Sequence, residues 1–75
     1  MQPLMVKVKS SNLESIGHDA DFVDILYVKF KGGGLYSYRP VKASFFKKFL
    51  KAKSKGKFFH KYVKDNKEYT VNRVN

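Results

Sequence analysis

The chain contains 75 residues, and its 16 Lys and Arg against 6 Asp and Glu give a formal net charge of +10. A chain of this length has room for one domain with a modest core, and its lack of cysteine excludes disulfide scaffolds and thiolate metal sites. No stretch approaches the roughly 18 apolar residues of a membrane span, and the N-terminus lacks the apolar run of a signal peptide. We expect a single cytoplasmic domain without integral membrane association.

The positive charge is concentrated in the second half of the chain. In residues 1–38 four lysines balance four acidic residues, whereas residues 39–75 contain twelve Lys and Arg against two acidic residues. The whole excess of +10 therefore lies in the second half. Charge concentrated in this way attracts anionic partners such as nucleic acid, anionic lipid or an acidic protein. A solvated basic face that only maintains solubility is the alternative.

The N-terminal part of the chain predicts one strand followed by a short helical turn. Apolar residues at positions 4, 6 and 8 give the alternation of a strand with one buried face. In residues 10–17, Ser11 and Glu14 have the spacing of a helix capping box. This segment predicts about one helical turn with Leu13 and Ile16 facing inward, and residues 18–21 (HDAD) predict a polar turn.

Residues 24–39 contain the clearest local signal, which is a β-hairpin. Two segments, DILYVKFK and LYSYR, flank the three glycines at positions 32–34. With a three-residue loop, Phe30 pairs with Tyr36 and Val28 pairs with Tyr38 on the core face. The outer face then carries Tyr27, Lys29, Lys31, Leu35, Ser37 and Arg39. Pro40 is suited to ending the second strand and opening a helix.

Two amphipathic helices are predicted after the hairpin. The first helix covers residues 41–53. With a rotation of about 100° per residue, its apolar residues fall on one side, namely Val41, Phe45, Phe46, Phe49, Leu50 and Ala52. A second helix, with Ser54 as its N-cap, gathers Phe58, Phe59, Tyr62 and Val63. Weak alternation in residues 68–74 suggests an extra strand after about residue 66, with the first strand as its candidate partner. We expect an α+β domain over residues 1–75, in which the two helices cover one face of a small antiparallel sheet formed by the N-terminal strand and the hairpin.

Three blocks of the sequence together resemble the KTSC domain, a small module of the type found at the C-terminus of some lysyl-tRNA synthetases. The blocks are residues 8–19 (VKSSNLESIGHD), the hairpin over residues 26–38 with its Tyr-x-Tyr strand, and residues 54–59 (SKGKFF). The chain departs from the family pattern at His18, where tyrosine is frequent, and in its lysine-rich helices. The resemblance implies a nucleic-acid-binding role, for RNA rather than DNA, a role inferred in the family largely from domain context.

The outer faces of the two helices are the main candidate binding site. They carry Lys47, Lys48 and Lys51 on the first helix and Lys57, Lys61 and Lys64, beside His60, on the second. If these faces point in one direction, they can hold a phosphate backbone without reading its sequence, and binding should depend strongly on salt. If the faces diverge, the lysines only solvate the helices.

Two smaller sites are also possible in the sequence. Residues 53–57 place Lys53, Lys55 and Lys57 around a helix N-terminus, where a phosphate could sit and Ser54 could bind it. For Ser54 we favour the interpretation that it caps the helix. The glycine at position 56 can be explained either by the close approach of a backbone or ligand or by a bend near the cap. On the hairpin, the cluster of Tyr27, Lys29 and Arg39 could stack an unpaired base, although a cross-strand Tyr27–Arg39 pair is the simpler reading.

The sequence does not predict an enzyme, a cofactor or a metal site. It has no glycine-rich phosphate motif and no paired carboxylates in a pocket-forming context. The spacing of His18, Asp19, Asp21 and Asp24 fits neither a calcium loop nor a zinc site. We therefore expect a nucleic-acid-binding module. The alternatives are a protein-interaction module or inhibitor docking on an acidic surface, and, less favoured because the phenylalanines are needed for the core, a peripheral membrane binder.

Overall fold

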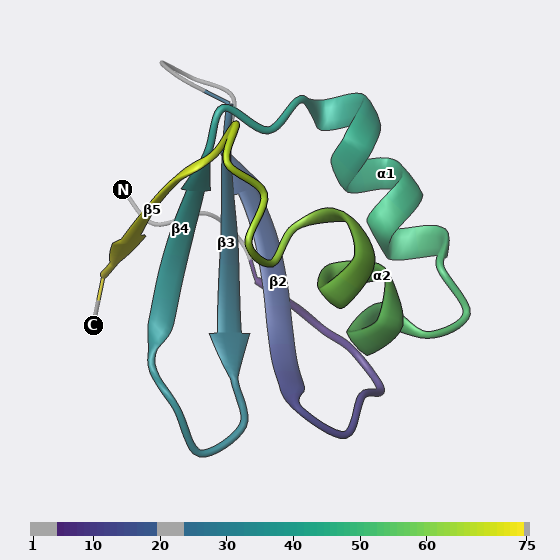
Figure 1. The fold of residues 1–75 in the computed structure, drawn as a ribbon. Coiled ribbons are helices and arrows are strands. Elements are labelled where there is room, and N and C mark those ends of the chain that lie inside the picture. Colours follow the sequence, from purple (N-terminus) through teal and green to yellow (C-terminus); the bar gives the residue numbers. More distant parts are fainter. Residues whose placement is uncertain (1–4, 20–23, 75) are drawn as a thin grey trace.

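The computed structural model describes residues 5–19 and 24–74, which form an antiparallel sheet covered on one face by two helices (Figure 1). The strands are β1 (Val6–Lys7), β2 (Leu13–Asp19), β3 (Ile25–Phe30), β4 (Leu35–Arg39) and β5 (Thr70–Arg73). They lie side by side in chain order, from β1 at one edge to β5 at the other. The helices are α1 (Ala43–Lys51) and α2 (Lys55–Tyr62). The predicted α+β architecture is confirmed, with five strands in the sheet instead of three.

The helical turn predicted for residues 10–17 is wrong, because most of this segment belongs to β2. Leu13 and Ile16 do face inward and are completely buried, but a β-bulge places them there. The register shifts between Leu13, opposite Phe30, and Ser15, opposite Lys29. The extra residue lets two side chains three positions apart share one face of the sheet, which a regular strand does not allow. A spacing of three residues is therefore compatible with a bulged strand as well as with a helix.

The polar turn predicted for residues 18–21 is also wrong where the structure describes it. His18 and Asp19 are the last residues of β2, and Ala20 and Asp21 lie outside the described residues. The His18 ring stacks on Phe46 of α1 with 5.4 Å between centroids. Its Nε2 atom hydrogen-bonds to the Val41 carbonyl oxygen, so Nε2 carries a proton. His18 thus ties the central sheet to the start of α1.

The β3–β4 hairpin is confirmed, but its register differs by two residues from the prediction. Val28 lies opposite Tyr36 and Lys29 opposite Leu35. The turn closes through a hydrogen bond from the Gly33 N–H to the Phe30 carbonyl oxygen at 3.2 Å. Gly32 has a φ of 65°, which glycine adopts without steric cost. Because side chains alternate with a period of two, this even shift keeps the strand residues on their predicted faces. Ser37, predicted at the surface, is nevertheless buried.

The core lies between the sheet and the helices. Its buried side chains are Leu13, Ile16, Leu26, Val28, Tyr38, Val41, Phe49, Phe59 and Val63. The aromatic faces of the helices meet where Phe49 stacks on Phe58 with 5.0 Å between centroids. The predicted inward positions are thus confirmed for Phe49, Phe59 and Val63, whereas Tyr62 is 43% exposed. Neither helix within the described residues is long or apolar enough to cross a bilayer.

The C-terminal strand exists, but it pairs with β4 and not with the first strand. Tyr38 of β4 lies opposite Val71, and Arg39 opposite Thr70. The first strand is unavailable as a partner because β1 occupies the opposite edge of the sheet. As Figure 1 shows, the chain returns from α2 to the sheet and adds β5 beside β4. This places the end of α2 near the hairpin, where a pocket forms.

Candidate nucleic-acid interface

The helix lysines predicted to bind phosphate are exposed in the structure. This set, the helix lysines, consists of Lys47, Lys48, Lys51, Lys57, Lys61 and Lys64. From residue 40 to residue 64 the chain contains nine lysines and no Asp or Glu. Among the residues that the structure describes, no carboxylate forms an ion pair with a helix lysine. Lys61 lies over the Tyr62 ring, 5.2 Å from its centroid.

The junction between α1 and α2 is held by hydrogen bonds within the protein. Ser54 Oγ accepts a hydrogen bond from the Lys57 backbone N–H at 3.3 Å, so the N-cap interpretation of Ser54 is confirmed. The Lys55 ammonium donates to the Ala52 carbonyl oxygen at 2.7 Å and satisfies a free acceptor at the end of α1. Lys53 is exposed between the helices. The phosphate seat predicted here stays a prediction, with Ser54 and Lys55 already engaged.

The predicted cluster on the outer hairpin face is arranged differently from the expectation. The register puts Ser37 opposite Tyr27, so the predicted Tyr27–Arg39 cross-strand pair is wrong. The Lys29 ammonium lies 3.4 Å from Glu14 on β2, and Arg39 is exposed. Base stacking by Tyr27 stays a prediction.

A polar cleft forms where the β1–β2 connection meets the start of α2. It has a volume of about 420 Å³ and is lined by Ser10, Ser11, Asn12, Ser54, Gly56, Lys57 and His60. Gly56 comes so close to the connection that an added Cβ would lie 2.9 Å from Asn12 Oδ1 and 3.2 Å from Ser10 Oγ. The glycine at position 56 is therefore explained by this close approach, which was one of the two explanations considered from the sequence.

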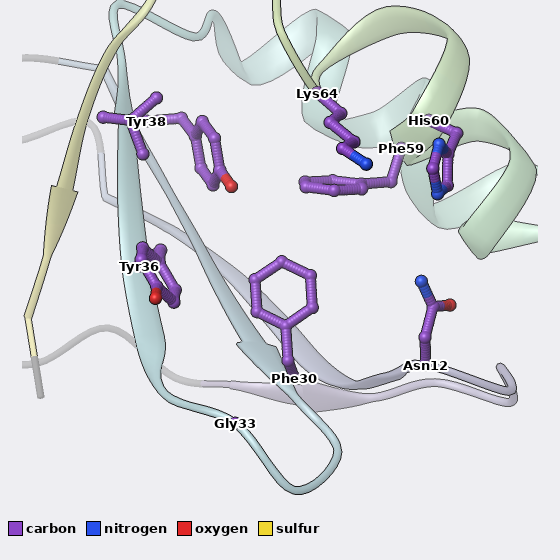
Figure 2. Close-up of a pocket in the computed structure, with 9 residues that line it drawn as sticks. Asn12, Phe30, Gly33, Tyr36, Tyr38, Phe59, His60 and Lys64 are labelled. Carbon is purple, nitrogen blue, oxygen red and sulfur yellow. The ribbon is translucent and has the colours of Figure 1, made fainter.

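An aromatic pocket of about 390 Å³ adjoins this cleft and shares Asn12 and His60 with it (Figure 2). Its remaining lining residues are Phe30, Gly33, Tyr36, Tyr38, Phe59, Lys64 and Val71. Phe30 contacts Tyr36 and Phe59 edge to face, with centroid distances of 5.6 and 5.3 Å. Tyr38 contacts Phe59 in the same way at 5.7 Å. Four rings from β3, β4 and α2 thus form the wall of a cavity that polar side chains border.

The Tyr38 hydroxyl stays protonated at neutral pH. The pKa of Tyr38 is raised above its usual value by burial of the phenol, and further by Tyr36 and Asp65. The Tyr38 phenol therefore adds no negative charge to the pocket wall. Within residues 5–19 and 24–74, no group of three or more His, Asp or Glu side chains could hold a metal ion.

The comparisons with known proteins identify the family. A family model of the KTSC domain matches residues 9–69, which is most of the chain. The chain belongs to the KTSC domain family. Its fold is similar to the crystal structure of a KTSC domain protein from Yersinia pestis, with a TM-score of 0.88 and 30% sequence identity over 99% of this chain and 100% of the other. None of the curated proteins matches the chain significantly.

The sequence reasoning missed the residues that line the aromatic pocket of this KTSC domain. The sequence assigns Phe30, Tyr36, Tyr38 and Phe59 to the core, and the structure confirms that they belong to it or pack against it, but the sequence gives neither these rings nor Asn12 a place in a pocket. The signal for the pocket was the pair of family blocks at residues 8–19 and 54–59. In the structure, Asn12 from the first block and Gly56 from the second are in contact distance, so the two blocks build one site.

Proposed function

We propose that this KTSC domain is a non-enzymatic nucleic-acid-binding module, for RNA, that holds the phosphate backbone on its helix lysines. The observation that carries the proposal is the row of exposed lysines from residue 47 to residue 64, without an intervening carboxylate or an ion pair in the described part of the chain. Such a row is not explained by stabilisation of the fold, because like charges at helical spacing repel each other. Neutralisation by phosphates would relieve that repulsion and release counterions.

Contacts of this kind supply affinity with little sequence discrimination. Each phosphate that a lysine neutralises adds about 0.7 to the salt slope for a single strand. Four such contacts correspond to a roughly fifty-fold loss of affinity between about 50 and 200 mM salt. The expected behaviour is that of a promiscuous, salt-sensitive binder.

The test is a titration of the protein with labelled tRNA and single-stranded DNA at about 50 and 200 mM salt. The variant changes Lys47, Lys51, Lys57 and Lys61 to Glu. Its matched control changes four exposed lysines outside the helices, Lys7, Lys9, Lys31 and Lys67, to Glu. Both variants have the same net charge, so only their positions differ.

We expect the helix variant to lose most of its affinity and salt dependence, and the control variant to lose much less. Equal losses would show that only net charge matters and would contradict a binding face on the helices. Undetectable binding of the wild type at the lower salt would refute the proposal. If a protein partner were captured in stoichiometric amount from a nuclease-treated lysate in that case, docking on an acidic protein surface would replace nucleic acid as the function.

A further inference from the structure

We propose that the aromatic pocket beside α2 receives one unpaired nucleobase, whose phosphate lies at Lys64. This inference rests on the proposed function and adds a second kind of contact to it. The lysines of the helices can hold any nucleic acid, duplex or single-stranded. The pocket would admit only a base that is not already stacked and paired, so it would select the single-stranded form.

The aromatic rings supply the first part of the argument. Phe30 and Tyr36 are only partly buried, whereas Tyr38 and Phe59 are buried. Their edge-to-face contacts, with interplanar angles of 75–80°, leave no parallel ring stack within the pocket wall. A flat base can therefore enter against a ring without displacing an existing stack. The volume of about 390 Å³ lies within the range of pockets that hold small ligands.

The orientation of Asn12 supplies the second part. Ser10 Oγ accepts hydrogen bonds from the backbone N–H groups of Asn12 and Leu13, at 3.3 and 3.2 Å. Its own proton is therefore donated to Asn12 Oδ1, at 2.9 Å. This bond fixes which end of the amide is the oxygen and leaves the NH₂ group without a protein acceptor in the described residues. Figure 2 shows this nitrogen on the side of the pocket, below His60.

The charge at the pocket rim supplies the third part. The Lys64 side chain projects from the end of α2 towards the space between Tyr38, Phe59 and His60 (Figure 2), and no described carboxylate pairs with it. The pocket thus combines a flat apolar wall with an amide donor and an ammonium group. A nucleobase with its phosphate matches all three, because it has a π-face, ring and carbonyl acceptors, and a negative charge. An apolar peptide side chain would leave the two donors unmatched.

The test uses four ligands at about 50 mM salt: a single-stranded RNA ten-mer, the same sequence as a duplex, an abasic ten-mer with the same phosphates, and adenosine monophosphate. We expect the wild type to bind the single strand about 5- to 160-fold more tightly than the abasic strand, which is the range measured for one stacked base. Preference for the strand over the mononucleotide would assign the base to a nucleic acid. Equal affinity for the two would support the pocket and assign it to free nucleotide.

Two variants locate the effect. Tyr36→Ala removes one ring of the wall, and Lys64→Gln removes the ammonium group while keeping an exposed polar side chain. Their matched controls are Tyr62→Ala, an exposed ring outside the pocket, and Lys67→Gln, an exposed lysine outside it. We expect both pocket variants to reduce the preference for the intact strand over the abasic strand, and both controls to keep it. Lys64→Gln should keep the fold. If Tyr36→Ala had a folding defect, Lys64→Gln would still test the pocket.

The outcomes separate this inference from the proposed function. If the wild type bound intact and abasic strands equally, the phosphate contacts would stand and the base pocket would be refuted. If the pocket variants kept the full base preference, the base would bind elsewhere and the pocket would again be refuted. If no strand bound, the proposed function and the pocket would both be wrong.

Discussion

At the scale of single residues, Gly56 shows how two distant segments come together. It lies in the first turn of α2, and it packs on the side chains of Ser10 and Asn12 in the connection before β2. A Cβ at this position would lie 2.9 Å from Asn12 Oδ1, which is closer than side chains normally approach. The same oxygen accepts the Ser10 hydrogen bond, so it cannot move freely. The contact therefore favours glycine at position 56.

This contact predicts that Gly56→Ala destabilises the protein. Overpacking costs about 1–3 kcal/mol, which exceeds the roughly 0.5–1 kcal/mol that alanine contributes within a helix. We expect a net loss of about 1 kcal/mol in the free energy of unfolding, measured by urea denaturation. In an Asn12→Ala background the nearer oxygen is absent and only Ser10 Oγ, at 3.2 Å, stays close, so there the same substitution should cost much less or be neutral. The same loss in both backgrounds would contradict the steric explanation.

Tyr38 predicts a dependence of stability on alkaline pH. Its pKa in the folded protein is raised, chiefly by burial, so the folded state holds the phenolic proton more tightly than the unfolded state does. The stabilisation is complete below the unfolded pKa of about 10 and is lost as the pH rises through the folded pKa. We expect the urea midpoint of the wild type to fall above about pH 10. The urea midpoint of Tyr38→Phe should fall less over the same pH range. If the midpoints of the two proteins fell in parallel, Tyr38 would not be responsible for the loss of stability.

At the scale of elements, each helix is defined by one buried aromatic face. α1 buries Phe49 completely, and α2 buries Phe59. Phe58 lies between these faces. Its ring stacks on the Phe49 ring, and its centroid lies 5.3 Å from the centroid of the Phe45 ring. Short helices of this kind are marginal in isolation and depend on such packing. Their lysines can therefore remain on the outside without a structural role.

The helix packing predicts a large difference between two aromatic substitutions. Phe49→Ala should cost about 3–5 kcal/mol in the free energy of unfolding, because it leaves a cavity in the core. Since small domains have a total stability of about 5–15 kcal/mol, a substantial unfolded population is expected. Tyr62→Ala should cost far less, since that ring is 43% exposed. Thermal denaturation followed by circular dichroism compares the two, and similar losses would contradict the observed helix orientation.

At the scale of the whole molecule, the charge of +10 opposes folding. The helices place lysines at positions 47 and 51 and at 57 and 61, four residues apart, and at 48 and 51, three apart. Each of these three like-charged pairs destabilises a helix by about 0.2–0.5 kcal/mol at low salt. Binding of an anion, as proposed above, would relieve this repulsion.

This repulsion predicts that added salt stabilises the protein. Screening of the three pairs should contribute about 0.6–1.5 kcal/mol, and each kilocalorie corresponds to roughly 4–8 °C in Tm for a domain of this size. Lys51→Glu with Lys61→Glu turns all three pairs into attractive ones. In that variant the increase of Tm with salt should disappear or reverse. The measurement is Tm between about 10 and 300 mM NaCl, and a wild-type Tm independent of salt would refute the prediction.

Patterns within short segments were enough to predict the helices, the hairpin and the charged face. The N-cap at Ser54 and the buried positions of Phe49 and Phe59 depend on helical periodicity, which neighbouring residues determine. The burial of Leu13 and Ile16 was predicted as well, but their spacing does not distinguish a helical turn from a bulged strand. Only the register against Phe30 and Lys29 of β3 resolves that ambiguity.

The sequence by itself thus determined the α+β class, the two amphipathic helices and the position of the positive charge, because these follow from local periodicity and composition. Only the tertiary structure decided the hairpin register, the partner of β5 and the aromatic pocket. The pocket brings Asn12, Phe30, Tyr36, Phe59 and Lys64 together from four separate segments. Such a juxtaposition depends on which strands pair and on which face the helices pack, and no local pattern encodes either.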